Sequence, residues 1–487
     1  MKSWADKNVL VLGLGETGLS LARWLNAQEA HVRVADSRAN PPGLDVLRRD
    51  CPQADIRCGT FDDSLLQGVD FIAISPGVPL ADPFVQRASA RGIPVIGDIE
   101  LFAQQVRERH APASAPSLSP SLSPTLSHEG RGSEREMQPL ILAITGANGK
   151  TTVTSMVEHL CRAAGKDAVA AGNISPAVLD VVLQRGANQP EIWALELSSF
   201  QLETTATLDA DAATVLNISE DHLDRYADID EYAAAKARIF HGSGVQVLNR
   251  DDARSMGMAL PGREVVTFGL DAPLNERDFG VERDGGDIWL RCGQSRLLKV
   301  TDLRIAELHN VANALAALAL CRAIDLPMPT LLEALRSFRG LPHRVERVAE
   351  IDGVLYYDDS KGTNVGATVA ALEGLGRKVV LIAGGEGKGQ DFAPLKPAVN
   401  KHARAVVLIG RDAQLIAAAL DGCGVPLLRT KDMSDAVRQA AQLAQSGDAV
   451  LLSPACASFD MFRNYAHRAE MFVDAVHELI KEAAWSR

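Results

Sequence analysis

The segment Ala143–Thr152 reads A-I-T-G-A-N-G-K-T-T, and it decides how the rest of the chain is interpreted. It follows the apolar run Leu140–Ile144, which predicts a buried strand, and precedes an amphipathic segment that predicts a helix. A glycine-rich turn between a strand and a helix presents backbone N–H groups and a helix N-terminus to phosphate groups. The segment therefore predicts a site for ATP or another nucleotide polyphosphate.

The pattern is shorter than the usual phosphate-loop consensus. G-x-x-x-x-G-K-[ST] requires glycine at position 144, where this chain has Ile144, so that only T-G-A-N-G-K-T remains. Lys150 is predicted to reach the outer phosphates and the Thr151 hydroxyl to hold Mg²⁺. The alternative is a chance Gly-Lys-Thr at a strand–helix turn. The nucleotide-binding residues predicted in this loop are Gly146, Asn148, Gly149, Lys150, Thr151 and Thr152.

Composition narrows the class of protein. A chain of 487 residues is long enough for several domains. Its formal charge of −12 argues against a nucleic-acid partner, which would require a basic face. Seven scattered cysteines without C-x-x-C favour reduced thiols in a cytoplasmic protein, and no signal peptide is evident. The most apolar helical stretch, Val311–Ala323, is short and contains Arg322, so it predicts a buried helix and no membrane span.

Continuous apolar runs recur along the chain, and each ends in Gly, Ser or Asn or is followed by one of them. Continuous runs are typical of strands buried on both faces, as in parallel sheets. Ala/Leu-rich segments at helical spacing lie between most of them, which predicts an α/β fold with doubly wound sheets. Besides Leu140–Gly146, the runs are Val9–Gly13, Phe71–Ser75, Ile192–Leu197, Ala213–Asn217, Val379–Gly384, Val406–Gly410 and Ala449–Ser453.

One segment interrupts this alternation. Residues 111–138 repeat Ser-Leu-Ser-Pro and have almost no apolar periodicity, which predicts a disordered linker. The linker separates a Rossmann-like domain at 1–110 from a central P-loop ATPase-like domain at 139–340. A new strand pattern after Gly340 predicts a third, Rossmann-like α/β domain at 341–487.

The first domain contains a dinucleotide-binding pattern. Residues 13–18 read G-L-G-E-T-G after a predicted strand, and Asp36 follows the next strand. Taken alone, this favours an NAD-dependent dehydrogenase. A glycine turn and a helix N-terminus bind any diphosphate, however, so a UDP group fits equally well. A turn without a ligand is the third possibility.

Further motifs follow the phosphate loop in a fixed order. With that loop, they resemble the Mur ligase family of peptidoglycan synthesis, and the glutamate-adding branch in particular. The resemblance covers nearly the whole chain except 111–138. The D-N-P-R motif of the diaminopimelate-adding relatives is missing, which favours glutamate. The motifs are Gly172–Ile174, Glu196–Glu203, Asn217–Tyr226, Ala235–Lys236, Leu308–Asn313, Leu341–Arg344, Asp359–Asn364 and Ser453–Ser458.

The resemblance implies an ATP-dependent amide ligase of cell-wall biogenesis, and hence of cell shape and division. ATP would convert the carboxylate of UDP-N-acetylmuramoyl-L-alanine to an acyl phosphate, which the amine of glutamate attacks. D-glutamate is the family default and L-glutamate the alternative. The resemblance also implies a monomer in the cytoplasm that uses no membrane. A dehydrogenase and a non-catalytic nucleotide-binding switch remain the alternatives from other classes.

By resemblance, the catalytic residues are Lys150, Glu196, His222 and Lys236. Thr151, Glu196, His222 and a carbamylated Lys236 would surround Mg²⁺. A neutral, partly desolvated amine can take up CO₂, whereas a solvated helical lysine is the alternative for Lys236. A structural histidine is the alternative for His222.

The resemblance also assigns binding residues. Asn310 and Asn313 would contact adenine, and Arg344 and Asp359 would reach the nucleotide from the third domain, so that the domains close over ATP. The residues implied for the UDP-sugar and glutamate are Thr17, Asp36, Ser37, Arg38, Gly77, Asn173, Ser198, Thr363, Lys388, Ser458 and Tyr465.

Three positions depart from the family pattern. Tyr465 stands where phenylalanine is usual, Ala469 where glycine is usual, and Arg339 where a small residue is common. All three lie in or next to the third domain. Because small shifts can invert a chiral pocket, they leave the enantiomer of glutamate open.

Overall fold

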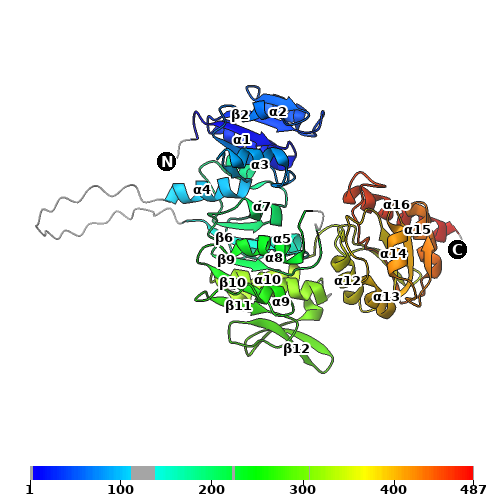
Figure 1. The fold of residues 1–487 in the computed structure, drawn as a ribbon. Helices are drawn as coiled ribbons and strands as arrows, with labels where there is room; N and C mark the ends of the chain where they lie inside the picture. Colours follow the sequence, from blue (N-terminus) through cyan, green and yellow to red (C-terminus); the bar gives the residue numbers. More distant parts are fainter. Residues whose placement is uncertain (1–3, 111–137, 222–224, 306–307, 486–487) are drawn as a thin grey trace, which may run out of the picture. The chain divides into compact units, whose positions relative to one another are not determined.

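The computed structural model describes residues 4–110, 138–221, 225–305 and 308–485, and Figure 1 shows its fold with some of the helices and strands labelled. The chain divides into two compact units. The first comprises Met1–Ile144, Gly165–Ala213 and Arg238–Val245, and the second comprises Thr145–Ala164, Thr214–Ala237 and Gln246–Arg487. The predicted linker at 111–138 lies outside the described residues apart from Gln138, so it stays a prediction, as do the predicted domain limits.

The first sheet has five parallel strands in the order β3-β2-β1-β4-β5. Leu10, Leu12, Ile72 and Ile74 form one apolar cluster with Phe84 and its helical neighbours. The elements are β1 (Asn8–Leu12), α1 (Glu16–Ala27), β2 (His31–Asp36), α2 (Leu44–Asp50), β3 (Asp55–Cys58), η1 (Asp63–Leu66), β4 (Phe71–Ile74), α3 (Pro83–Ala90) and β5 (Val95–Ile96).

The second sheet has nine strands in the order β14-β13-β12-β11-β10-β9-β6-β8-β7. Its strands are β6 (Leu140–Thr145), β7 (Ala168–Gly172), β8 (Ile192–Glu196), β9 (Ala212–Val215), β10 (Val245–Asn249), β11 (Val265–Phe268), β12 (Phe279–Asp284), β13 (Asp287–Cys292) and β14 (Ser295–Lys299). β12 to β14 form an antiparallel meander, which the expected βα alternation did not include. These strands are only partly buried and carry polar residues, so they lack a continuous apolar run.

The helices of this part of the chain include α10, which confirms the prediction of a buried helix at Val311–Ala323. Among the described residues, no helix combines the length and the hydropathy that crossing a membrane requires. The elements are α4 (Asp98–His110), α5 (Lys150–Ala163), α6 (Val178–Arg185), α7 (Ser199–Glu203), α8 (Ile229–Ala237), η2 (Arg238–Phe240), α9 (Ala253–Met256), η3 (Val300–Asp302), α10 (Leu308–Ala323) and α11 (Met328–Ser337).

The third sheet has six strands in the order β15-β16-β20-β17-β18-β19, parallel except for the β15/β16 pair. Its elements are β15 (Glu346–Ile351), β16 (Val354–Asp358), α12 (Val365–Gly374), β17 (Val379–Gly384), α13 (Leu395–His402), β18 (Ala403–Ile409), α14 (Ala413–Ala419), β19 (Leu427–Arg429), α15 (Met433–Leu443), β20 (Ala449–Leu452) and α16 (Tyr465–Trp485).

Strand β17 shows that this sheet is buried on both faces. Val379 and Leu381 pack in one apolar cluster with residues of α13 and α14. The intervening Val380 and Ile382 pack in a second cluster with residues of α15 and α16. Helices therefore cover both faces, and the predicted α/β class with parallel-rich sheets is confirmed.

Candidate active site

The phosphate loop joins β6 to α5. Gly149 precedes the first residue of α5 at a φ of +81°, and no side chain caps the helix N-terminus. A Cβ on Gly149 would lie 2.6 Å from Asn313 Oδ1, so both its conformation and its surroundings favour glycine. The first N–H groups of a helix have no partner within the helix, so the N-terminus of α5 can bind an anion.

Two lysines converge on the same carbonyl of this loop. Lys150 Nζ donates to Gly146 O and Ala147 O, each at 2.8 Å. Lys236 Nζ, from α8, donates to Gly146 O at 2.9 Å and Thr145 Oγ1 at 3.3 Å. Lys236 is only 1% exposed, which is rare for a lysine and contradicts a solvated helical position. The loop thus gathers positive charge where a polyphosphate requires it.

Small-molecule sites typically have volumes of about 300–1,000 Å³, and a cavity of ≈ 520 Å³ adjoins the phosphate loop. It collects residues from the loop, from α10, from the segment before β15, from the segment after β16 and from α12. Arg344 Nη2 donates to Thr151 Oγ1 at 2.6 Å, and Asn313 Nδ2 donates to Asn310 Oδ1 at 3.3 Å. Of the predicted nucleotide-binding residues, the cavity brings together Asn148, Gly149, Thr152, Asn310, Asn313, Arg344 and Asp359.

Hydrogen bonds hold the residues around Arg344 in place. His343 Nδ1 and Asp358 Oδ2 are 2.6 Å apart, and His343 has a φ of +62°, which is uncommon for a residue with a side chain. Asp359 Oδ2 accepts from Ser453 Oγ at 2.6 Å, and burial raises the pKa of Asp359 to about 7. The loop that carries Arg344 is thus fixed from the end of β16.

Glu196 ends β8 in the first unit, beside Ile144 of β6. It is 2% exposed, and its Oε1 accepts from Asn173 Nδ2 at 2.8 Å. Its Oε2 has no hydrogen-bond partner among the described residues. A buried carboxylate oxygen that accepts no hydrogen bond is a suitable ligand for a hard cation such as Mg²⁺. Of the other predicted metal ligands, Thr151 and Lys236 belong to the second unit, and His222 lies outside the described residues.

Ser198 follows Glu196 and caps α7. Its Oγ accepts from Gln201 N at 3.2 Å, while Gln201 Oε1 accepts from Ser198 N at 3.1 Å, which forms a capping box. Gln201 is absent from the predicted site. The signal for it was the S-x-x-Q spacing, which predicts a helix start and carries no information about a ligand.

The residues predicted for glutamate lie on three loops of the third sheet. These loops follow β16, β17 and β20, which are adjacent and parallel, so their carboxyl ends meet at one edge. Ala455 N donates to Gly362 O at 3.0 Å, and Glu386 pairs with Ala457 in an isolated bridge. Thr363, Lys388 and Ser458 are thus each within a few residues of a contact between these loops.

The three departures from the family pattern lie in different surroundings. The Tyr465 backbone carbonyl accepts from Ser360 Oγ at 2.7 Å, and its ring lies 3.9 Å from Lys361 Nζ. Ala469 is buried within α16, where alanine is favoured over glycine. Arg339 is exposed.

The glycine turn of the first sheet is closed by Asp36. Asp36 Oδ2 accepts from Leu14 N at 2.7 Å, and both carboxylate oxygens accept from Arg38. Burial acts to raise the pKa of Asp36, but the hydrogen bonds from Arg38 and Leu14 outweigh it and lower the pKa to about 2. Thr17 is half-buried nearby on α1, whereas Ser37, Arg38 and Gly77 are exposed.

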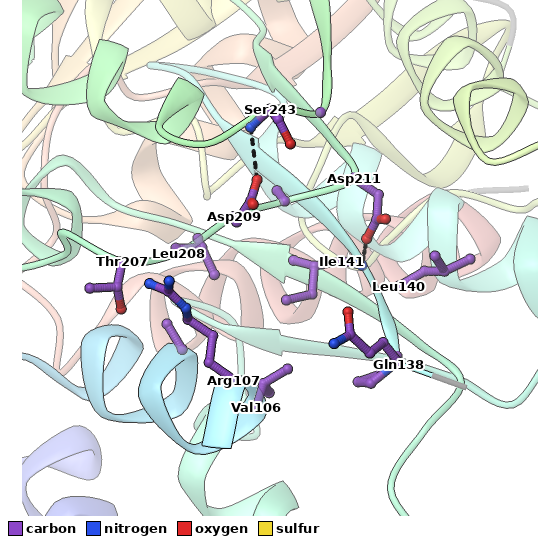
Figure 2. A pocket seen from close by; sticks show the side chains of 14 residues that line it. Val106, Arg107, Gln138, Leu140, Ile141, Thr207, Leu208, Asp209, Asp211 and Ser243 are labelled. Carbon is purple, nitrogen blue, oxygen red and sulfur yellow. Dashed lines mark hydrogen bonds between the residues drawn. The ribbon is translucent and has the colours of Figure 1, made fainter. Parts of the chain in front are cut away.

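A second cavity, of ≈ 430 Å³, lies at the amino ends of β6 and β9 (Figure 2). Asp209 Oδ1 accepts from Ser243 N at 2.8 Å, and Asp211 Oδ2 accepts from Ile141 N at 2.7 Å. The phosphate loop follows the carboxyl end of β6, so this cavity lies at the opposite end of that strand. None of the predicted site residues lines it.

A phosphate loop after a parallel strand is typical of α/β nucleotide-binding proteins. Comparison with known domains places this chain among the ligases of that class. Residues 7–97 match the Mur ligase MurD-like N-terminal domain, 144–321 the Mur ligase middle domain, and 343–456 the Mur ligase glutamate ligase domain.

Full-length relatives agree with these matches. The UDP-N-acetylmuramoylalanine–D-glutamate ligase of Nitrosomonas europaea is 55% identical over 97% of both chains. The enzyme of that name from Methylobacillus flagellatus is 57% identical over 98% of both chains. The chain therefore belongs to the Mur ligase family, and the predicted ATP-dependent ligase activity is confirmed.

Solved structures show the same fold at low identity. The UDP-N-acetylmuramate–alanine ligase of Thermotoga maritima aligns over 97% of this chain and 99% of its own, with a TM-score of 0.59 and 18% identity. A pseudomurein peptide ligase of Methanothermus fervidus aligns over 98% and 100%, with a TM-score of 0.57 and 18% identity.

Proposed function

We propose that this protein joins D-glutamate to the carboxyl group of UDP-N-acetylmuramoyl-L-alanine and converts ATP to ADP and phosphate. The observation that carries the proposal is the 55% identity, over 97% of the chain, to a ligase named for that reaction. The names of both relatives favour D-glutamate over the L-glutamate alternative. The dehydrogenase alternative is not favoured, because residues 7–97, which include its glycine turn, match a Mur ligase domain.

The reaction needs charge neutralisation and alignment. A substrate carboxylate oxygen attacks the γ-phosphorus as the bond to ADP breaks. The glutamate amine then attacks the acyl carbon, loses a proton and expels phosphate. Lys150, the N-terminus of α5 and Arg344 hold the phosphate groups, while Asn310 and Asn313 bind adenine. Glu196, Thr151 and His222 would hold Mg²⁺, which would supply further neutralisation of phosphate charge.

Lys236 is the proposed site of carbamylation. The Lys236 ammonium would first lose a proton to give a neutral amine. The amine nitrogen would then form a bond to CO₂ and lose a second proton, so that a carbamate anion replaces the cation. The burial of Lys236 against Gly146 O and the Tyr232 ring supports this proposal, because a desolvated amine loses its proton more readily. Removal of CO₂ and bicarbonate is expected to lower the turnover of the wild type and to leave a Lys236→Ala variant unchanged.

The substrate-binding residues fall into three groups, one for each part of the substrates. Thr363, Lys388, Ser458 and the neighbourhood of Tyr465 would hold the two carboxylates of glutamate. Ser198 and Asn173 would contact the muramoyl peptide. The UDP group would lie against Thr17, Asp36, Ser37, Arg38 and Gly77. A monomer in the cytoplasm remains part of the proposal, and seven free thiols agree with a reducing compartment.

The test is phosphate release by purified protein with UDP-N-acetylmuramoyl-L-alanine, Mg²⁺, bicarbonate and either enantiomer of glutamate. We expect release with D-glutamate only, and a product whose mass equals both substrates less water. Turnover with L-glutamate alone would reverse the stereochemical assignment. Slow hydrolysis that is indifferent to the UDP substrate would instead support a nucleotide-binding switch, and oxidation of NADH with an oxo acid would support a dehydrogenase.

A further inference from the structure

The carboxyl group of Asp98 is buried at the start of α4, where the backbone N–H groups of Asp98 and Ile99 also interact with it. Its side chain is 1% exposed, and burial raises its pKa to about 6. Oδ2 accepts from Gln201 Nε2 at 3.0 Å, whereas Oδ1 has no hydrogen-bond partner among the described residues. Buried polar atoms without partners are uncommon in proteins, so this one calls for an explanation.

The partner of Asp98 uses both ends of its amide. Gln201, itself 2% exposed, donates through Nε2 to Asp98 and accepts through Oε1 from Ser198 N and Ser198 Oγ, each at 3.1 Å. If the amide were reversed, its NH₂ group would face the Ser198 N–H, and its oxygen would face a carboxyl oxygen. Both contacts would be lost, so Asp98 and the Ser198 N–H together set the orientation of the Gln201 amide.

Ser198 lies two residues after Glu196, at the carboxyl end of β8. We propose that Asp98 is a positioning residue for the UDP-muramoyl substrate: it orients Gln201, which fixes the hydroxyl of Ser198 and the segment that follows Glu196. This inference rests on the proposed function, which assigns Ser198 to that substrate. Asp98 touches no substrate in this scheme and acts only through Gln201.

A purely structural role for Asp98 is less well supported, because α4 has other anchors. Glu100 Oε2 accepts from Ala206 N at 2.7 Å and Thr207 N at 2.9 Å, and its Oε1 accepts from Thr207 Oγ1. Phe102 also packs edge-to-face on Trp193, with ring centroids 4.8 Å apart. Glu100 joins the same helix to the segment after α7 but does not contact Ser198, so it offers a matched control.

The experiment compares Asp98→Ala, Asp98→Asn and Glu100→Ala in the full chain, by KM for each substrate, kcat and Tm. Loss of one hydrogen bond in the relay is expected to raise the KM for the UDP substrate about three- to tenfold in Asp98→Ala, with the KM for ATP unchanged. Asp98→Asn retains an acceptor for Gln201 and is expected to stay within about twofold of the wild type. Glu100→Ala is expected to lower the Tm and leave this KM unchanged.

Two outcomes would overturn the inference: an equal rise in KM in Glu100→Ala, or an unchanged KM in Asp98→Ala. If Asp98→Ala does not fold, Gln201→Leu replaces it, with the same expected rise in KM. Combining Asp98→Ala with Ser198→Ala should add nothing to Ser198→Ala alone, and full additivity would contradict the relay. A wild type that releases no phosphate with these substrates refutes the proposed function itself, whereas an active wild type with a normal Asp98→Ala refutes only the positioning role.

Discussion

The two glycine turns of this chain use the same backbone device in opposite electrostatic surroundings. Both lead from a parallel strand into a helix whose N-terminus has no side-chain cap. In the first turn, the carboxylate of Asp36 occupies the backbone N–H of Leu14. In the second, Lys150 lies against the loop and Arg344 contacts Thr151. A glycine turn therefore offers donors to any phosphate, and the neighbouring charges decide how much negative charge it can hold.

The largest expected effect concerns the cationic turn. Lys150→Ala is expected to lower phosphate release by about 1,000-fold, because the outer phosphates lose their nearest ammonium group. The measurement is phosphate release at saturating substrates. Lys166→Ala, which removes an exposed ion pair with Glu191, is the control and should remain active. Normal turnover in Lys150→Ala would remove this loop from the mechanism.

Close packing in the first turn gives the next largest effect. A Cβ on Gly18 would lie 1.8 Å from Gly13 O, whereas a Cβ on Gly15 would meet nothing within 4 Å. Gly18→Ala is therefore expected to lower the free energy of unfolding by about 3 kcal/mol. Gly15→Ala, at the N-cap of α1, is expected to lower it by no more than about 1 kcal/mol. Urea denaturation of both variants measures the contrast, and equal stabilities would contradict the described turn.

The charge of Asp36 can be tested through pH. Its pKa is lowered from 3.8 to about 2 in the folded protein, so its ionised form stabilises the fold above pH 3.8, and this stabilisation is lost as the pH falls through 2. The free energy of unfolding of the wild type should exceed that of Asp36→Asn by about 2 kcal/mol near neutral pH, and the difference should shrink at acid pH. Urea denaturation of both proteins, from neutral pH down to acid pH, measures this difference. A difference independent of pH would mean that the charge on Asp36 contributes nothing to the turn.

The smallest effect is expected from changes in residues 111–138, which lie between the two glycine turns in the sequence. Replacement of residues 111–138 by a short Gly/Ser linker is expected to change kcat and both KM values by less than about twofold, because their composition offers little apolar surface for packing. The assay is again phosphate release, with folding checked by circular dichroism. A folded deletion variant that no longer turns over ATP would show that this segment serves one of the two turns.

Much of the fold was predictable because buried parallel strands leave a strong signal. The run Val379–Gly384 corresponds residue for residue to β17. The meander β12–β14 was not predicted, since partly exposed antiparallel strands such as Asp287–Cys292 mix polar and apolar residues. Strand pairing of this kind depends on distant neighbours, which a local pattern does not reveal.

The candidate site was predictable where the residues of a motif have a known physical role in binding. The cavity beside the phosphate loop contains Asn310 and Asn313 as well as Arg344, which is far from them in sequence. The relay from Asp98 to Ser198 could not be predicted, because an acidic residue at a helix start usually indicates only a favourable helix dipole. Which carboxyl group is buried, and against which amide, depends on packing between segments about a hundred residues apart.

The shared acceptor at Gly146 links the chemistry of Lys236 to that of Lys150. Both ammonium groups donate to one carbonyl oxygen, so each reduces what the other gains there. A carbamate on Lys236 would keep a single N–H in place of three and would carry a negative charge, so its contact with Gly146 O would weaken relative to that of Lys150. Dissolved carbon dioxide would then influence how strongly Gly146 O holds Lys150. Nucleotide affinity would thus depend on the concentration of carbon dioxide.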